Sequence, residues 1–201
     1  MDVQLRPDMN VKSLNKIKIL SKFKNVLFSF ILLISIIFWW LVSWPINMSP
    51  DSLNIWQQVL SGNYFKSHPV SYSLFIKIIS INGNYLFIVS FIQLVLFTSA
   101  IYFVSYSLSK SHNFSKFISA LVIFFPTGGS FATTLWKDVP FTALILIGFV
   151  FLKKDWRLSN VAFGIIFLSL GASFRHNGWI LIIFCALDRK STRLNSSHTD
   201  I

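Results

Sequence analysis

Apolar runs separated by short polar stretches dominate this chain and predict an all-α protein whose helices cross a membrane. The run 26–46 contains no charged residue, and as a helix it extends about 30 Å, the thickness of the hydrocarbon core of a bilayer. It ends in Trp39, Trp40 and Trp44, and such aromatic side chains settle at the membrane–water interface. A cleaved signal peptide has a shorter apolar region and a small-residue cleavage site, so we interpret 26–46 as a retained transmembrane helix.

Further apolar segments follow, most of them shorter than the twenty or so residues of an ordinary span. Pro126 and the pair Gly128 and Gly129 interrupt one segment, where we expect the helix to bend or open. The pattern predicts a polytopic transmembrane helix bundle over 26–187, with later spans at about 85–108, 117–133, 139–152, 158–174 and 178–187.

The loop 47–84 between the first two spans is too long for a simple connection and carries helix signals of its own. Ser49 as N-cap, Pro50 at the first helical position and Asp51 in the first turn predict the start of a helix, and Gly62 predicts its end. Apolar residues recur between these signals at helical spacing, which is typical of an amphipathic helix lying on the membrane surface. We expect the apolar segment 70–79 to be a second interfacial helix or a re-entrant one.

Composition and charge support this class of protein and predict its orientation. Charged residues make up 12% of the 201 residues, against about 25% in an ordinary soluble domain. The net charge of +11 comes from short basic groups between apolar runs, an arrangement that indicates membrane topology and no nucleic-acid partner. The groups lie before the first predicted span and after every second span, so all of them fall on the same face of the membrane. By the positive-inside rule this face is cytoplasmic, which predicts a multi-pass cell-membrane protein with a cytoplasmic N-terminus. The groups are the leader 1–25, Lys110 with Lys116, Lys153 with Lys154 and Arg157, and Arg189 with Lys190.

The two ends of the chain differ from the bundle between them. We expect the basic leader 1–25 to be partly disordered. Residues 188–201 show no periodicity and resemble a translated sequencing-adapter scar, so we interpret them as a non-native tail on the N-terminal part of a longer protein. The alternative is a solvated cytoplasmic tail. A single cysteine, Cys185, excludes an internal disulfide.

The same topology gathers three polar clusters at the outer face: Asp51, the pair Lys137 and Asp138, and the turn from Arg175 to Asn177. Ionisable groups at the edge of hydrocarbon are costly, which makes them candidates for a functional site. Each also has a structural alternative. Asp51 complements a helix dipole, Asp138 caps a helix, Lys137 snorkels, and Arg175 anchors the interface or pairs with one of the two acids.

The order of these features resembles the GT-C superfamily of lipid-dependent membrane glycosyltransferases. A cytoplasmic N-terminus, one span, an acid early in a long outer loop with interfacial helices, and then a multi-span bundle are common to both. An uncharacterised family of bacterial multi-pass membrane proteins is more similar still, over roughly 26–187. The residues that carry this resemblance are Ser49-Pro50-Asp51-Ser52, Trp56, His68-Pro69, Trp136-Lys137-Asp138-Val139-Pro140 and Arg175-His176-Asn177-Gly178.

The resemblance implies transfer of a sugar from a polyprenyl-phosphate carrier in the membrane lipid to an acceptor on the outer face. Asp51 matches the catalytic acid of the first outer loop, as a base or as the ligand of a divalent cation, the one candidate cofactor. Asp138 matches a second acidic position. Arg175 and Lys137 suit the donor phosphate. The remaining substrate-binding candidates are His176, Asn177, His68 and Trp56.

Two other functions remain open at this point. The first is a transporter or flippase for a lipid-linked or anionic solute, a class that places ionisable residues near the membrane midplane. The second is a non-catalytic membrane scaffold, in which the clusters are unrelated caps and anchors. The enzyme hypothesis requires Asp51, Asp138 and Arg175 to converge on one outward-opening cavity, within about 10 Å of each other.

Overall fold

The computed structural model of the chain describes residues 11–64, 68–153, 157–180 and 183, with side chains from Ile19 onward. Within these residues the regular secondary structure is helical, and a single isolated backbone bridge joins Asn47 to Thr134. The predicted all-α fold is therefore confirmed.

Among the described residues, two helices are long and apolar enough to cross a membrane, which supports the predicted membrane association. They are the Ile19–Val42 part of α1 (Val11–Val42) and the whole of α4 (Leu86–Ser109). The bounds of α4 agree with the predicted span 85–108. Those of α1 differ from the predicted span 26–46, because the helix begins within the basic leader 1–25 and ends four residues before Ile46. No glycine or proline interrupts 11–42, whereas Pro45 disfavours helix in the residue before it.

The predicted bend at Pro126 is confirmed as a sharp break. Helix α5 (His112–Phe124) and helix α6 (Pro126–Thr133) meet at an angle of 80°. Pro126 supplies no N–H to continue the ladder of α5 and instead takes the first position of α6. The segment predicted as one span over 117–133 is thus a broken span or a re-entrant loop.

Helices α7 (Asp138–Lys153) and α8 (Leu158–Ser173) pack along each other and agree with the predicted spans 139–152 and 158–174. Glycines make the close approach possible. A Cβ on Gly148 would lie 2.8 Å from Leu168 Cγ, and one on Gly164 would lie 2.5 Å from Leu152 Cδ2. The last predicted span starts as helix at Gly178. Residues 178–180 and 183 of this span are described, whereas the rest of the span and the tail 188–201 lie outside the described residues.

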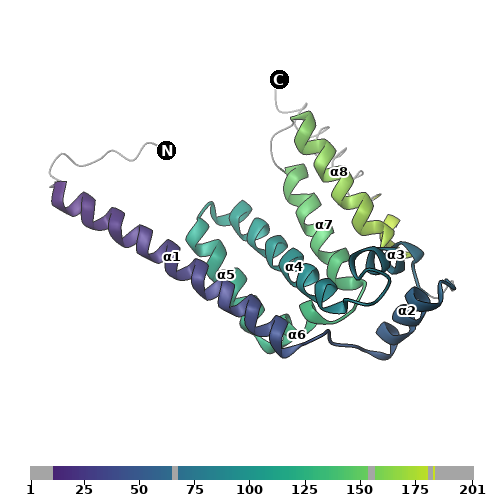
Figure 1. Cartoon of the computed structure of the whole chain (residues 1–201). Helices are drawn as coiled ribbons and strands as arrows, with labels where there is room; N and C mark the ends of the chain where they lie inside the picture. The colour runs from purple at the N-terminus through teal and green to yellow at the C-terminus, as the bar shows by residue number, and fades with distance from the viewer. Residues whose placement is uncertain (1–10, 65–67, 154–156, 181–182, 184–201) are drawn as a thin grey trace, which may run out of the picture.

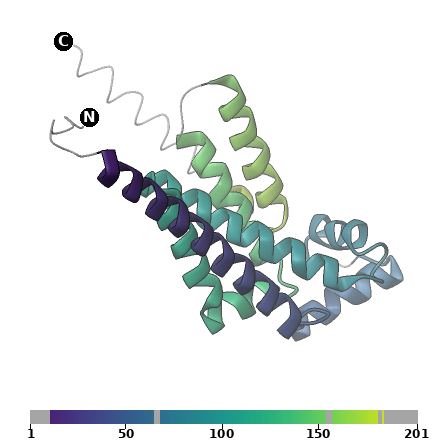
Figure 2. The same ribbon diagram turned by 60° about the vertical axis from the view of Figure 1, so that its left-hand side comes forward.

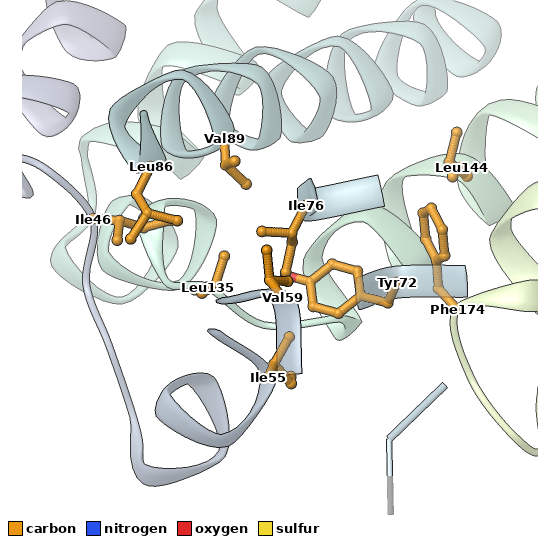
Figure 3. Close-up of a cluster of buried hydrophobic side chains, with 10 residues drawn as sticks. All are labelled: Ile46, Ile55, Val59, Tyr72, Ile76, Leu86, Val89, Leu135, Leu144 and Phe174. Atoms are coloured by element: carbon orange, nitrogen blue, oxygen red, sulfur yellow. The ribbon is translucent and has the colours of Figure 1, made fainter. Parts of the chain in front are cut away.

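The long helices form a row in which α4 is central, with α5 and α7 beside it, α1 against α5 and α8 against α7 (Figures 1 and 2). The short helices α2 (Pro50–Ser61) and α3 (Val70–Ile79) lie at the end of the bundle where α1 ends and α4 begins. A buried apolar cluster joins them to the bundle there (Figure 3). Its members are Ile46, Ile55, Val59, Tyr72, Ile76, Leu86, Val89, Leu135, Leu144 and Phe174.

Candidate functional site

A pocket of about 400 Å³ opens at this end of the bundle, and we call it the polar pocket. Ser49, Pro50, Asp51, Ile55, His68, Trp136, Lys137 and Asp138 line it. Four of the site residues predicted from sequence therefore meet there: Asp51 and His68 from the loop 47–84, and Lys137 and Asp138 from a segment about 70 to 90 positions later in the chain. Asp51 and Asp138 are also the only acidic residues in the described part of the chain.

Asp51 reaches the pocket because of how α2 begins. Ser49 Oγ accepts from the backbone N–H of Ser52 at 3.3 Å, and Ser52 Oγ accepts from the N–H of Ser49 at 3.1 Å, a reciprocal capping box. Pro50 takes the first position, and Gly62 ends the helix with a φ of 72°. The predicted helix is confirmed, and Ser49 caps it. The carboxylate of Asp51 is exposed at the pocket.

Hydrogen bonds fix α2 beside the segment that leads into α7. Ser52 Oγ donates to the carbonyl of Leu135 at 2.9 Å, and Trp136 Nε1 donates to Ser49 Oγ at 2.6 Å. From the other side, Gln93 Nε2 donates to the carbonyl of Trp136 at 3.1 Å. Because Trp136 is held from both sides, the next two residues, Lys137 and Asp138, face the same pocket as Asp51.

The turn after α8 is anchored by Phe174, which is 2% exposed and packs its ring 5.7 Å from that of Tyr72 and 5.2 Å from that of Phe75 (Figure 3). Ser71 Oγ also donates to the carbonyl of Ser173. The end of α8 is thus attached to α3. This attachment places Arg175, the next residue, beside the start of α7.

Arg175 forms an ion pair with Asp138, with 2.9 Å between Nε and Oδ1. Its guanidinium carbon also lies 5.3 Å from the centre of the Phe141 ring. Asp138 Oδ1 is buried and accepts no well-aligned hydrogen bond from the described residues, so the contact with Arg175 is chiefly electrostatic. Of the two partners proposed for Arg175, the structure selects Asp138. The guanidinium lies next to the polar pocket without lining it.

His68 is the most enclosed ionisable side chain of the pocket, with 7% of its surface exposed. Burial lowers its pKa below the ordinary value because the imidazolium loses hydration, and the positive charge of Lys137 lowers it further. Asp51 opposes this shift, and His176 adds a smaller lowering. Nδ1 is buried without a hydrogen-bond partner among the described residues. His68 therefore lines the pocket with an imidazole whose protonation is disfavoured.

Besides Arg175, three predicted residues lie outside the pocket lining. Trp56 is not brought to it, because its indole packs against the apolar cluster and its Nε1 would lie 3.3 Å from a Cβ on Gly83. His176 and Asn177 are exposed in the turn after α8. His176 is close enough to His68 for its charge to act on that ring.

Gln93 is a positioning residue that the sequence analysis missed. It is fully buried and donates both to Trp136 and, at 3.3 Å, to the hydroxyl of Tyr72. The sequence does contain a signal for such a role, because Gln93 is the one amide in the predicted span 85–108.

For metal binding, the described residues contain no group of three or more His, Cys, Asp or Glu side chains arranged to hold an ion. Asp51 as a cation ligand therefore stays a prediction that needs further ligands from a substrate. Comparison of the chain with protein-family models, with curated proteins and with solved structures finds no match.

Proposed function

We propose that this protein is a multi-pass, GT-C-like glycosyltransferase that transfers a sugar from a polyprenyl-phosphate carrier to an acceptor at the outer face of the cell membrane. One observation carries the proposal. The two carboxylates of the described chain line a single pocket at one end of the helix bundle, together with Lys137 and beside Arg175. Charged groups are costly at a membrane boundary, so a cluster of them from different segments favours a shared function.

The proposed reaction uses the carboxylates and the cations for opposite tasks. The bond between the anomeric carbon of the sugar and the phosphate oxygen breaks, and an acceptor oxygen forms the new bond to that carbon. The proton of the acceptor hydroxyl passes to Asp51, which is exposed and needed by no helix cap. The polyprenyl phosphate departs with the electron pair of the broken bond.

Lys137 and Arg175 bind the phosphate and stabilise the charge that develops on it as it leaves. Asp138 orients Arg175 through Nε. A guanidinium has five N–H donors, so one contact leaves donors for a phosphate. The imidazole of His68 lines the pocket and hydrogen-bonds a sugar hydroxyl there. His176 and Asn177 form the rim on the side of α8.

The position of the ionisable groups favours this reaction over transport. A transporter places such groups in interrupted helices near the membrane midplane. Here both described acids lie at helix starts, Asp51 in α2 and Asp138 in α7. Within the candidate span α4 the one amide, Gln93, holds Trp136 and Tyr72 in place.

The test measures two quantities on the full chain in membranes: transfer of label from a panel of polyprenyl-phosphate hexoses, and binding of polyprenyl phosphate itself. Asp51→Asn should lower turnover about 100-fold or more, the usual loss of a general base, and leave polyprenyl phosphate bound. Lys137→Gln and Arg175→Gln should weaken that binding. Unchanged turnover in the double variant Asp51→Asn with Asp138→Asn would contradict the proposal.

Matched controls come from exposed cations away from the pocket. Lys24 lies in the first half of α1, and Arg157 precedes α8, which Arg175 follows. Lys24→Gln and Arg157→Gln remove the same charges away from the pocket and line neither the pocket nor the hollows near Lys153, so both should keep wild-type binding of polyprenyl phosphate and wild-type turnover.

A further inference from the structure

Two adjoining hollows of about 270 and 180 Å³ lie between the C-terminal halves of α4 and α7, and Ser107, Val150 and Lys153 line both. We call them together the basic groove. Its defining residues are Phe103, Ser107, Lys110, Val150, Phe151 and Lys153. Lys110 directly follows α4 and Lys153 ends α7, so both ammonium groups lie at one end of the groove. This end is remote from the polar pocket, which opens where α7 begins.

The groove combines an apolar wall with positive charge that no carboxylate of the described residues pairs. Phe103, Val150 and Phe151 supply the wall, while Lys110 and Lys153 are both exposed. The described part of the chain offers these lysines no carboxylate. Its two acids are in the polar pocket, and Asp138 begins the helix that Lys153 ends, which separates the two residues by about 23 Å along the axis. The connection 154–156 lies outside the described residues.

A ligand that fits this groove must cover the apolar wall and also pair with the two lysines. It must do so at the level where a membrane helix ends. Helix α4 is a candidate span, so Lys110 at its end lies at the depth of lipid headgroups. A small soluble anion pairs with the lysines and leaves the apolar wall uncovered. A neutral lipid covers the wall and leaves the lysines unpaired. An anionic phospholipid satisfies both, and basic pockets between membrane helices bind such headgroups.

The geometry points to a binding site for an anionic phospholipid in the basic groove. Its phosphate is held between Lys110 and Lys153, and an acyl chain lies along Phe103, Val150 and Phe151. The site is independent of the glycosyltransferase proposal, because it shares no residue with the polar pocket.

The experiment uses the full chain in phosphatidylcholine vesicles with traces of spin-labelled phosphatidylglycerol or phosphatidylcholine. The fraction of motionally restricted label gives the preference for the anionic lipid. Lys110→Gln with Lys153→Gln should lower this preference by about fivefold per lysine. Glutamine at position 110 meets the same backbone strain as lysine, since φ there is 56°. Arginine at both positions should restore the preference.

Two controls separate a site from general surface attraction. Lys22→Gln with Lys24→Gln removes the same charge from α1, which packs against α5, α4 and α6, and should leave the preference unchanged. Val150→Trp fills both hollows and should reduce the restricted fraction, whereas Ile166→Trp, at an exposed position of α8, should not.

Three results would overturn the inference. An equal loss in the two lysine pairs would show a general attraction of anionic lipid to a basic surface. Displacement of the lipid by excess inorganic phosphate would show a small-anion site. A full lipid preference in Val150→Trp would show that the groove holds no acyl chain.

Discussion

His68 and Asp51 give the polar pocket two proton acceptors of different character. The carboxylate is exposed, whereas the imidazole is enclosed and burial opposes its protonation, which lowers its pKa. The charges around the ring act in opposite directions, since Lys137 and His176 lower its pKa and Asp51 raises it. The pKa of His68 therefore reports the arrangement of the whole pocket.

We expect His68 to titrate below about 6.5, the ordinary pKa of histidine. Lys137→Gln removes a positive charge and should raise this pKa, whereas Asp51→Asn removes a negative charge and should lower it. Imidazole NMR titration of the detergent-solubilised chain measures both shifts, with His68→Asn to assign the resonance and Lys153→Gln as a distant control. A shift of the same sign in both variants would show that the pocket is arranged differently.

The same shift has a consequence for stability. The unfolded chain protonates His68 near pH 6.5 and the folded chain only at lower pH, so the unfolded state binds more protons between these values. Stability from this group is complete above about pH 6.5 and is lost as the pH falls through the pKa of the folded state. His68→Asn should remove this part of the pH dependence, and His112→Asn should retain it.

At the scale of the helices, α2 supports the segment that leads into α7. Its capping residue Ser52 is fully buried and also donates to Leu135, 83 residues away. A local helix start and a long-range contact therefore depend on one hydroxyl group.

Ser52→Ala should lower the free energy of unfolding by about 1 to 3 kcal/mol, because it removes half of the capping box and the bond to the Leu135 carbonyl. Ser61→Ala, at the exposed end of the same helix, should cost less than about 0.5 kcal/mol. Thermal or denaturant unfolding in detergent compares the two variants. Equal costs would mean that α2 does not support the segment leading into α7.

The short helix α6 is held against α1 at a glycine. A Cβ on Gly129 would lie 2.1 Å from Cε2 of Trp39, far inside contact distance. Gly129→Ala should therefore destabilise the protein by about 1 to 3 kcal/mol through overpacking. In a Trp39→Leu background the same substitution should cost clearly less, since the smaller side chain leaves room. A double-mutant cycle of unfolding free energies measures this coupling, and additive effects would place the ring elsewhere.

At the scale of the whole molecule, the polar pocket and the basic groove lie at opposite ends of the helix bundle. Asp138 of the pocket begins α7, and Lys153 of the groove ends it. Two lysines that the sequence assigns to the cytoplasmic side, Lys110 and Lys153, follow or end helices that begin near the pocket, α4 and α7 (Figure 1). This polarity agrees with an outward-facing pocket and an inward-facing basic groove.

Cysteine labelling in intact cells tests this orientation. In a Cys185→Ser background, Asn63→Cys near the pocket end should react with a membrane-impermeant maleimide. Ser159→Cys at the start of α8 should react only after the membrane is permeabilised. Both native side chains are exposed, so access to reagent should reflect the side of the membrane. The reverse pattern would place the pocket in the cytoplasm and exclude an outer-face transferase.

Much of the helical organisation follows from local signals that the sequence displays. Ser49, Pro50 and Gly62 delimit α2, and Pro126 breaks the helix at the predicted place. The start of α1 was missed, because basic residues predict solvent exposure and a cytoplasmic location without ending a helix that no glycine or proline interrupts.

The sequence by itself determined the all-α fold class and most helix ends, because apolar run length, caps and prolines act within a few residues. Tertiary structure decided the pocket. Asp51 meets Lys137 and Asp138 only through bonds such as Trp136 to Ser49, which joins residues 87 positions apart. The burial of His68, the removal of Trp56 from the site and the choice of Asp138 as the partner of Arg175 likewise depend on packing between α2, α3, α7 and α8. Such contacts leave no local pattern in the chain.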